Sequence, residues 1–256
     1  MRNLIRMDLY RMGKTAGCRV CLLITLILSL IYTPMSWLLY QLAKMFAPSD
    51  VQPFMTELPL SGILNSPFPV LGLMLSLLSA CYFFYGDLES GYIKNIAGQM
   101  PKKGYTVLSK FLCVIPHHLA FMAAGILGNV IGTVFFCRIS PDAQVGAALL
   151  NLPIRLLLLL AMSALLLLVT VPLRSKSFGL VLAVLMGTGL MFLLYMGVDS
   201  GLDRLGVHGF NLESYMPDQL IGAEKPNIAR CLAVGAGWIA VLLPLSMYLF
   251  DRRDIK

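Results

Sequence analysis

The chain has 256 residues, of which 58% are hydrophobic and only 13% are charged. An ordinary globular domain is about 45–50% apolar and about 25% charged. So few charges cannot solvate the surface of a water-soluble domain of this size, and so apolar a chain is not disordered. The composition therefore predicts an integral membrane protein.

Six apolar segments are candidates for membrane spans, because about 20 apolar residues cross a hydrocarbon core of about 30 Å. They lie at residues 20–42, 63–85, 111–136, 154–171, 178–198 and 231–250. Pro67 and Pro69 stand at the entrance of the second segment, so a short span over residues 70–85 is one interpretation and an earlier start at Ile63 is the alternative. We expect one domain over residues 1–256, an all-α polytopic membrane protein with six transmembrane helices.

The distribution of charge predicts the orientation of these spans. With the N-terminus inside, 14 basic and five acidic residues fall on the cytoplasmic side, against six basic and eight acidic residues outside. The net charge of +7 thus divides into +9 inside and −2 outside. Cytoplasmic loops of membrane proteins carry an excess of Lys and Arg. We expect both termini to be cytoplasmic, and the basic residues indicate topology rather than a nucleic-acid partner.

Residues 1–17 predict a short amphipathic helix ahead of the first span. Its apolar face is formed by Ile5, Leu9, Met12 and Ala16, and its opposite face by Arg6, Tyr10 and Lys14. A helix with an apolar and a basic face lies flat at an anionic membrane surface. The alternative is a solvated tail whose basic residues only set the topology.

The sequence carries no recognisable ATP site. Residues 13–15, Gly-Lys-Thr, end like a phosphate-binding loop, but Asp8 stands where that motif needs its first glycine. We therefore expect no ATP hydrolysis by this chain and no cofactor.

Metal and proton chemistry also lack a convincing constellation. Adjacent residues of a helix point in different directions, so His117 and His118 cannot easily hold one metal ion. A polar pair near the interface, or a hydrogen bond inside the bundle, is the favoured interpretation, with a functional pair as the alternative. Arg155, at the very start of the fourth segment, is the only Asp, Glu, Lys or Arg that we place in a span. Proton relays usually need several ionisable groups inside the membrane.

Small residues in the spans predict close helix packing. Gly128 and Gly132 form a small-xxx-small pattern, and further glycine pairs occur at 187 and 189 and at 235 and 237. Such patterns let two helices approach closely, either within one chain or between two chains. Packing within the chain is the simpler interpretation, and a dimer contact is the alternative.

The segment 86–110, which follows the second span and leads into the third, has the most distinctive pattern. It contains Asp87, Glu89, Gly91, Lys94, Pro101, Lys102, Lys103, Tyr105, Ser109 and Lys110. Acidic residues open it, a glycine permits a turn, and a proline precedes a basic pair. On residue types alone, this is a positively charged connecting loop.

The same pattern resembles that of permease subunits of type-2 ABC exporters, which include bacteriocin and lantibiotic self-protection and peptide-export systems. In that family an acidic residue and a glycine follow the second span, then a lysine, a basic residue and a closing Ser-Lys. The end of the chain, residues 248–256, also resembles the family's basic ending. A lysine pair at 102–103 departs from the arginine that is frequent there.

The resemblance implies a separate ABC ATPase subunit that docks under the 86–110 loop. The implied coupling residues are Asp87, Glu89, Gly91, Lys94, Lys102 and Lys103. It also implies a second permease chain, identical or different, contact with membrane lipid, and a hydrophobic or amphipathic substrate such as a peptide, an antimicrobial or a drug. The expected location is a bacterial cytoplasmic membrane. The rival interpretation is an ATP-independent carrier, or an immunity or scaffold protein that acts by binding.

The orientation can be tested by single-cysteine labelling in a cysteine-free background. A cysteine at position 103 should react only from the cytoplasmic side, and one at position 218 only from outside, because the positive-inside rule places these loops there. Reaction of position 103 from the outside would contradict the whole topology.

Overall fold

The computed structural model describes residues 2–46, 57–68, 71–91, 102–206, 211–223 and 227–252. Its helices are α1 (Arg2–Lys14), α2 (Ala16–Phe46), α3 (Leu60–Asn65), α4 (Gly72–Glu89), α6 (Gly104–Phe136), α7 (Val145–Thr170), α8 (Lys176–Thr188), α9 (Met191–Arg204), α10 (Pro217–Leu220) and α11 (Ile228–Arg252), with a 3-10 turn at Leu212–Tyr215. Two strands of three residues, β1 (Glu57–Pro59) and β2 (Arg138–Ser140), pair in parallel. The expected all-α class is confirmed.

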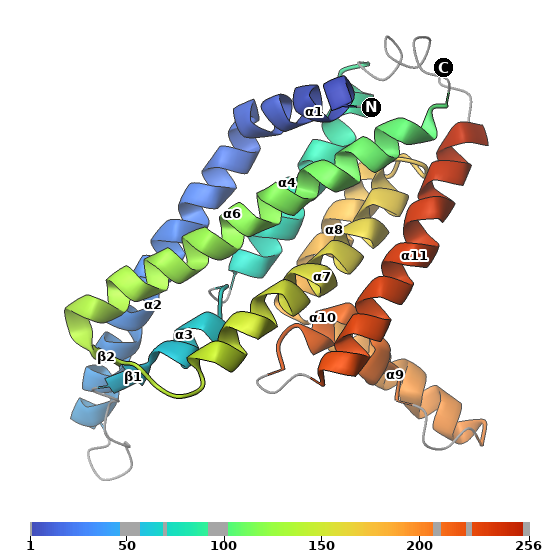
Figure 1. Cartoon of the computed structure of the whole chain (residues 1–256). Helices are drawn as coiled ribbons and strands as arrows, with labels where there is room; N and C mark the ends of the chain where they lie inside the picture. Colours follow the sequence, from blue (N-terminus) through green and yellow to red (C-terminus); the bar gives the residue numbers. More distant parts are fainter. Residues whose placement is uncertain are drawn as a thin grey trace.

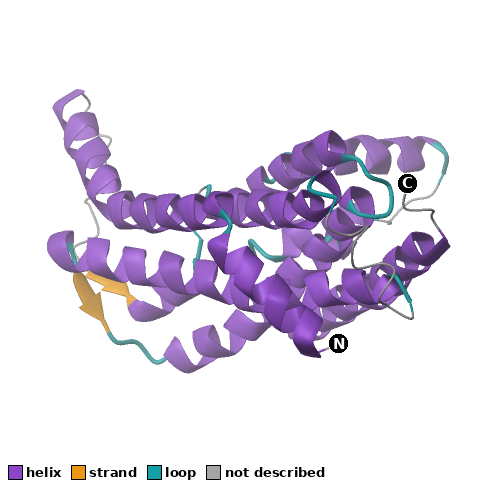
Figure 2. Cartoon of the chain, turned by 90° about the horizontal axis from the view of Figure 1, so that it is seen from above, coloured by secondary structure: helices purple, strands orange, loops and turns teal. Residues whose placement is uncertain are grey.

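The helices form an elongated bundle with two distinct ends (Figure 1). The start of α1, the last turn of α4, the first turn of α6 and the last turn of α11 lie together at one end, which we call the terminal end. The two strands lie at the other, the strand end, and the view from above shows the same separation (Figure 2). The start of α1 and the end of α11 thus lie at the same end of the bundle.

Within the described ranges, four helices are long and apolar enough to cross a membrane, namely α2, α6, α7 and α11. The pair α8 and α9 could supply a fifth span, but its axes are bent by 87°. The described residues are therefore those of a helical membrane protein with four or five candidate spans, where the sequence predicted six.

The second predicted span, 63–85, is interrupted. Helix α3 ends at Asn65 and α4 begins at Gly72, so the start near residue 70 agrees with the structure and a continuous helix from Ile63 is wrong. Pro67 and Pro69 explain the break, since proline lacks the backbone donor and pushes the preceding residue out of the helical region. The 18 residues of α4 extend over about 27 Å, and two of them, Asp87 and Glu89, are acidic.

The fifth predicted span, 178–198, is also broken. Helix α8 has 13 residues, or about 20 Å, too short to cross a membrane alone. Gly189 ends it with φ of 76°, a left-handed conformation that glycine adopts without steric cost. Helix α9 then leaves at the steep angle, as Figure 1 shows at the strand end.

Helix α7 occupies the centre of the bundle. In its most apolar stretch 61% of the residues are buried, against 17% in α2 and in α11. Helices α3, α4, α6, α8, α10 and α11 all contact it. A helix that is apolar all round is expected in such a central position, whereas the outer faces of α2 and α11 are apolar and exposed, as lipid contact requires.

Helix α1 is present, and the side that it buries in the bundle coincides only in part with its predicted apolar face. Its buried side chains are Leu4, Asp8 and Met12. Leu9, which was expected on the apolar face, is 39% exposed, and Ala16 already belongs to α2. Helix α1 packs against α6 with its buried side, so Leu9 is left on the surface of the bundle, where an interfacial helix would contact lipid.

The loop between α9 and α11, which the predicted topology places outside, contains the two short helical turns at 212–215 and 217–220. Asp218 is only 6% exposed, and the Tyr195 hydroxyl donates a hydrogen bond to its Oδ1 at 3.0 Å. Burial raises the pKa of the Asp218 carboxyl, opposed by hydrogen bonds from Gln219 and Tyr195. A labelling reagent would not reach position 218, and Leu205, which is 80% exposed, is the better outer position.

Close packing through glycine occurs within the chain, as the simpler interpretation held. A Cβ atom at Gly132 would lie 2.4 Å from the Leu30 carbonyl oxygen, and one at Gly128 would lie 2.5 Å from the Ser29 Cβ. Both contacts join α6 to α2, and the hydroxyls of Thr33 and Thr133 meet beside them at 3.1 Å. These glycines hold the two helices together.

Gly132→Leu should therefore destabilise the bundle, because the obstructing atom is backbone and cannot rotate away. We expect a loss of about 1–3 kcal/mol, seen as a lower melting temperature in detergent. Gly237→Leu on α11 is the control, since nothing lies within 4 Å of that position. Equal melting of the two variants would contradict the α2–α6 contact.

Candidate functional site

The predicted coupling segment runs between the last turn of α4 and the first turn of α6, at the terminal end. Asp87 and Glu89 belong to the last turn of α4, and Gly91 follows it. Lys102 and Lys103 directly precede α6. Residues 92–101, with the predicted site residue Lys94, lie outside the described residues.

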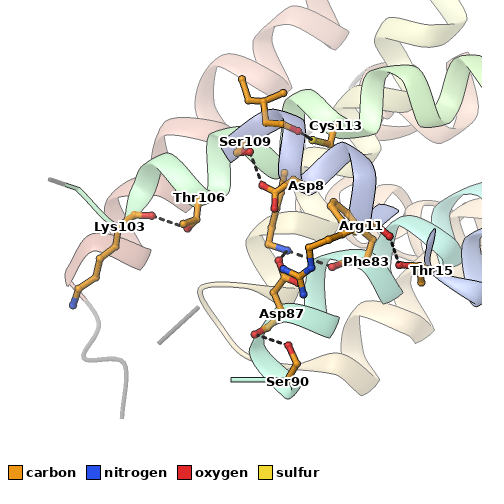
Figure 3. A network of polar contacts seen from close by, with 12 residues as sticks. Asp8, Arg11, Thr15, Phe83, Asp87, Ser90, Lys103, Thr106, Ser109 and Cys113 are labelled. Carbon is orange, nitrogen blue, oxygen red and sulfur yellow. Dashed lines mark hydrogen bonds and ion pairs between the residues drawn. The ribbon is translucent and has the colours of Figure 1, made fainter. Parts of the chain in front are cut away.

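Asp87 is the centre of a buried ion cluster. Its side chain accepts Arg11 Nη2 on Oδ1 at 2.7 Å and Lys110 Nζ on Oδ2 at 2.6 Å (Figure 3). Asp87 is 5% exposed and Lys110 only 1%. A buried charge is tolerated only when it is paired and hydrogen-bonded. The carboxylate therefore joins α4 to α1 and to α6.

Two further contacts complete the surroundings of Lys110. Its Nζ donates to the Phe83 carbonyl oxygen at 3.3 Å and lies 4.6 Å from the centre of the Phe83 ring. The ammonium group is thus surrounded by a carboxylate, a carbonyl oxygen and an aromatic face, all from α4.

Asp8 supplies the second buried carboxylate of the cluster. It is 2% exposed and accepts a hydrogen bond from the Ser109 hydroxyl at 2.5 Å (Figure 3). Burial raises the pKa of the Asp8 carboxyl, while the Ser109 hydrogen bond and Lys110 act in the opposite direction. Asp8 and Arg11 stand one helical turn apart, so α1 presents both to the same neighbours. We call Asp8, Arg11, Asp87 and Lys110 the ion cluster.

Sequence reasoning missed most of this cluster. Asp8, Arg11 and Lys110 were counted as charges that set topology, and only Asp87 was a predicted site residue. The one available signal was the spacing of Asp8 and Arg11, which places opposite charges on one face of α1.

Glu89 lies outside the ion cluster and forms a separate surface pair. Its carboxylate accepts Lys176 Nζ at 2.9 and 3.2 Å. The side chains are 61% and 33% exposed, respectively. This pair connects the end of α4 to the start of α8, and water screens it.

Gly91 provides the expected turn. Its φ is 67°, and its amide donates to the Leu88 carbonyl oxygen at 3.3 Å. Only glycine adopts this conformation without strain, and the chain leaves α4 here.

On the other side of the segment, α6 is fastened to α11. The Gly104 amide donates to Asp251 Oδ1 at 2.6 Å. A Cβ atom at Gly104 would lie 3.1 Å from the Met247 carbonyl oxygen, so the approach of the two helices is close. Lys102 is exposed, and Lys103 is half-buried with its carbonyl oxygen accepting the Thr106 hydroxyl at 2.7 Å.

The histidine pair lies inside the bundle and is hydrogen-bonded to serines. His118 Nδ1 and Nε2 lie 2.7 Å from the hydroxyls of Ser76 and Ser163, and His117 Nε2 lies 2.8 Å from the Ser79 hydroxyl. The contacts join α4, α6 and α7, as the hydrogen-bond interpretation expected. Among the described residues no three His, Cys, Asp or Glu side chains are grouped to hold a metal ion.

Arg155 is buried at the strand end and holds the loop between α9 and α11. Its two terminal nitrogens donate to the carbonyl oxygens of Ile221 at 2.6 Å and Ala223 at 3.2 Å. The guanidinium thus supplies donors to carbonyl oxygens at and after the end of the short α10, where no helical amide can reach them.

Comparisons with protein-family models, with curated proteins and with solved structures give no match. The function proposed below therefore rests on the residues of this chain.

Two carboxylates, two residues apart, give a direct test of the ion cluster. Asp87→Asn should cost about 3–5 kcal/mol, because it leaves the buried Lys110 and the partly exposed Arg11 without their shared counter-ion. Glu89→Gln should cost only about 0–1 kcal/mol, because its pair is exposed. Thermal unfolding in detergent measures both, and an equal effect of the two changes would contradict the buried cluster.

Proposed function

We propose that the chain is the membrane-spanning permease subunit of a type-2 ABC exporter. It pairs with a second permease chain to form the path of a hydrophobic or amphipathic substrate, and a separate ATPase subunit drives transport. In this proposal α4 and the α8–α9 pair complete six spans, α1 is the interfacial helix, and the terminal end faces the cytoplasm.

The observation that carries the proposal is the way in which both ends of the 92–101 segment are fastened. Asp87 lies two residues before the end of α4, and its partner Lys110 lies in the second turn of α6. The same carboxylate also binds Arg11 of α1. A protein that displaced this segment would therefore move three helices together instead of bending a free loop.

Two more contacts spread such a displacement through the bundle. Glu89 connects the segment to α8 through Lys176, and Gly104 connects it to α11 through Asp251. Packed helices and ion pairs of this kind carry coupling between distant sites. A partner at the terminal end would thus act on α1, α4, α6, α8 and α11, which fits a permease driven from outside the chain.

The geometry also divides the predicted coupling residues into two groups. Asp87 is buried and paired within the ion cluster, so its role is to transmit movement of α4 to α1 and α6. Glu89 and Lys102 are exposed and available to a partner protein. Lys94 stays in the docking set as a prediction from the sequence.

The apolar interior favours a hydrophobic or amphipathic substrate. The four clear spans each contain an 18-residue window with at most two charged residues. An ion-coupled carrier usually places several ionisable groups in the membrane. The rival, an ATP-independent carrier or a protein that acts by binding, would require no ATPase partner.

Purification from native membranes separates these alternatives. An affinity-tagged chain should retain a free-standing ATPase that carries its own phosphate-binding loop. ATP hydrolysis should require that subunit and be absent from the chain alone. Turnover by the chain alone, or full transport without any ATPase, would overturn the proposal.

Glu89→Ala and Lys176→Ala test the docking role more sharply, because each removes one half of the same surface pair. If Glu89 contacts the ATPase, only Glu89→Ala should weaken its association, by about 2–5 kcal/mol, while melting of both variants stays close to wild type. A Glu89→Ala, Lys94→Ala double variant should lose substrate-stimulated turnover.

Equal behaviour of the two single variants would assign Glu89 to the intramolecular pair alone. Full transport by the double variant would leave the segment as a simple connection. Gly91→Val is a poor probe, since valine is strained at the φ of 67° found there.

A further inference from the structure

A groove lies where α1 meets α2, beside α6. The chain changes direction at Thr15, which belongs to neither helix. The space beneath this joint measures about 270 Å³ and is lined by residues of all three helices, among them Leu9, Met12, Arg19, Leu22, Ala120 and Phe121.

Apart from the buried His117 and from Arg19, the walls of the groove are apolar, and its mouth is open. Met12 and Phe121 are buried at its base, whereas Leu9 and Ala120 are exposed at its rim. A volume of about 270 Å³ is slightly below that of a typical small-molecule pocket, about 300–1,000 Å³. It suits part of a flexible hydrocarbon chain.

The mouth of the groove carries positive charge. Arg19 is the one charged residue of the lining. Its Nη2 donates to the Lys14 carbonyl oxygen at 3.1 Å, so the side chain is held across the α1–α2 joint. A guanidinium has five N–H donors, which leaves others for a ligand. Lys14 and Arg6 are exposed on α1 nearby along the chain.

The groove also lies at the correct depth for a lipid headgroup. Arg19 immediately precedes the apolar run of α2, which begins at Val20. A basic residue at the edge of a membrane span lies at headgroup level, with the apolar residues beyond it among the acyl chains.

We propose that this groove binds an anionic phospholipid, with one acyl chain against α6 and the phosphate at Arg19. The occupant follows from charge complementarity: an apolar slot that opens beside a guanidinium matches an acyl chain that ends in an anionic headgroup. The proposal depends on the membrane location of the helices and not on an ATPase partner.

Two glycines provide a matched test. Gly13 lines the groove and Gly17 does not, and a Cβ atom at either would meet nothing within 4 Å. Gly13→Phe should therefore fill the groove without disturbing the fold, and Gly17→Phe should add the same side chain outside it. Equal melting temperatures verify that both variants fold.

Native mass spectrometry of the delipidated full chain measures binding of phosphatidylglycerol and phosphatidylcholine with identical acyl chains. Wild type and Gly17→Phe should each retain one tightly bound phosphatidylglycerol in preference to phosphatidylcholine, and Gly13→Phe should lose it. Arg19→Gln should weaken phosphatidylglycerol about fivefold, whereas Arg252→Gln, an equal change of charge on α11, should not.

Three results would overturn the proposal. Equal affinity for the two lipids would exclude anionic recognition. Unchanged binding in Gly13→Phe would place the lipid elsewhere on the basic surface. An equal loss in Arg252→Gln would show that net charge alone attracts the lipid.

Discussion

The carboxylate of Asp87 is the constraint on which the terminal end depends. It lies buried between Arg11 and Lys110, and removing charges from water costs several kcal/mol per ion unless they stay paired. The three side chains must therefore remain together whenever the bundle is folded. Because they come from α4, α1 and α6, this requirement fixes the position of α1 on the bundle. It also fixes both ends of the segment between α4 and α6.

The strand end is organised differently, by interruptions instead of charges. Helix α4 begins late, after the prolines at 67 and 69, and its neighbour α8 ends early at Gly189. The two interrupted helices pack together where a Cβ atom at Gly187 would lie 2.3 Å from the Met74 Cα. The first turn of α4 and the last turn of α8 therefore lie near each other, and Arg155 holds the loop between α9 and α11 at the same end. One end of the molecule is fixed by ion pairs, and the other contains the irregular backbone.

The sequence predicted what depends on local pattern. Long apolar runs gave α2, α6, α7 and α11, and the small residues at 128 and 132 gave the close contact with α2. It failed where distant residues decide the outcome. Asp8 and Ser109 are 101 positions apart, and counting charges by side cannot show which of them are buried. The sequence predicts close helix packing at Gly189, whereas this glycine ends α8. A glycine in an apolar run indicates a close approach of helices and a helix end equally well.

Helix α1 links the two sites proposed for this chain. Its Asp8 and Arg11 join the ion cluster, and its Leu9, Met12 and Gly13 line the groove. These two sets fall on one short helix whose position the ion cluster fixes. A lipid in the groove would favour the same docked position of α1 that the cluster requires. A partner that moved α4 and α6 would have to move α1, and with it one wall of the groove. Because linkage is reciprocal, lipid occupancy and displacement of the 92–101 segment would then each alter the free energy of the other.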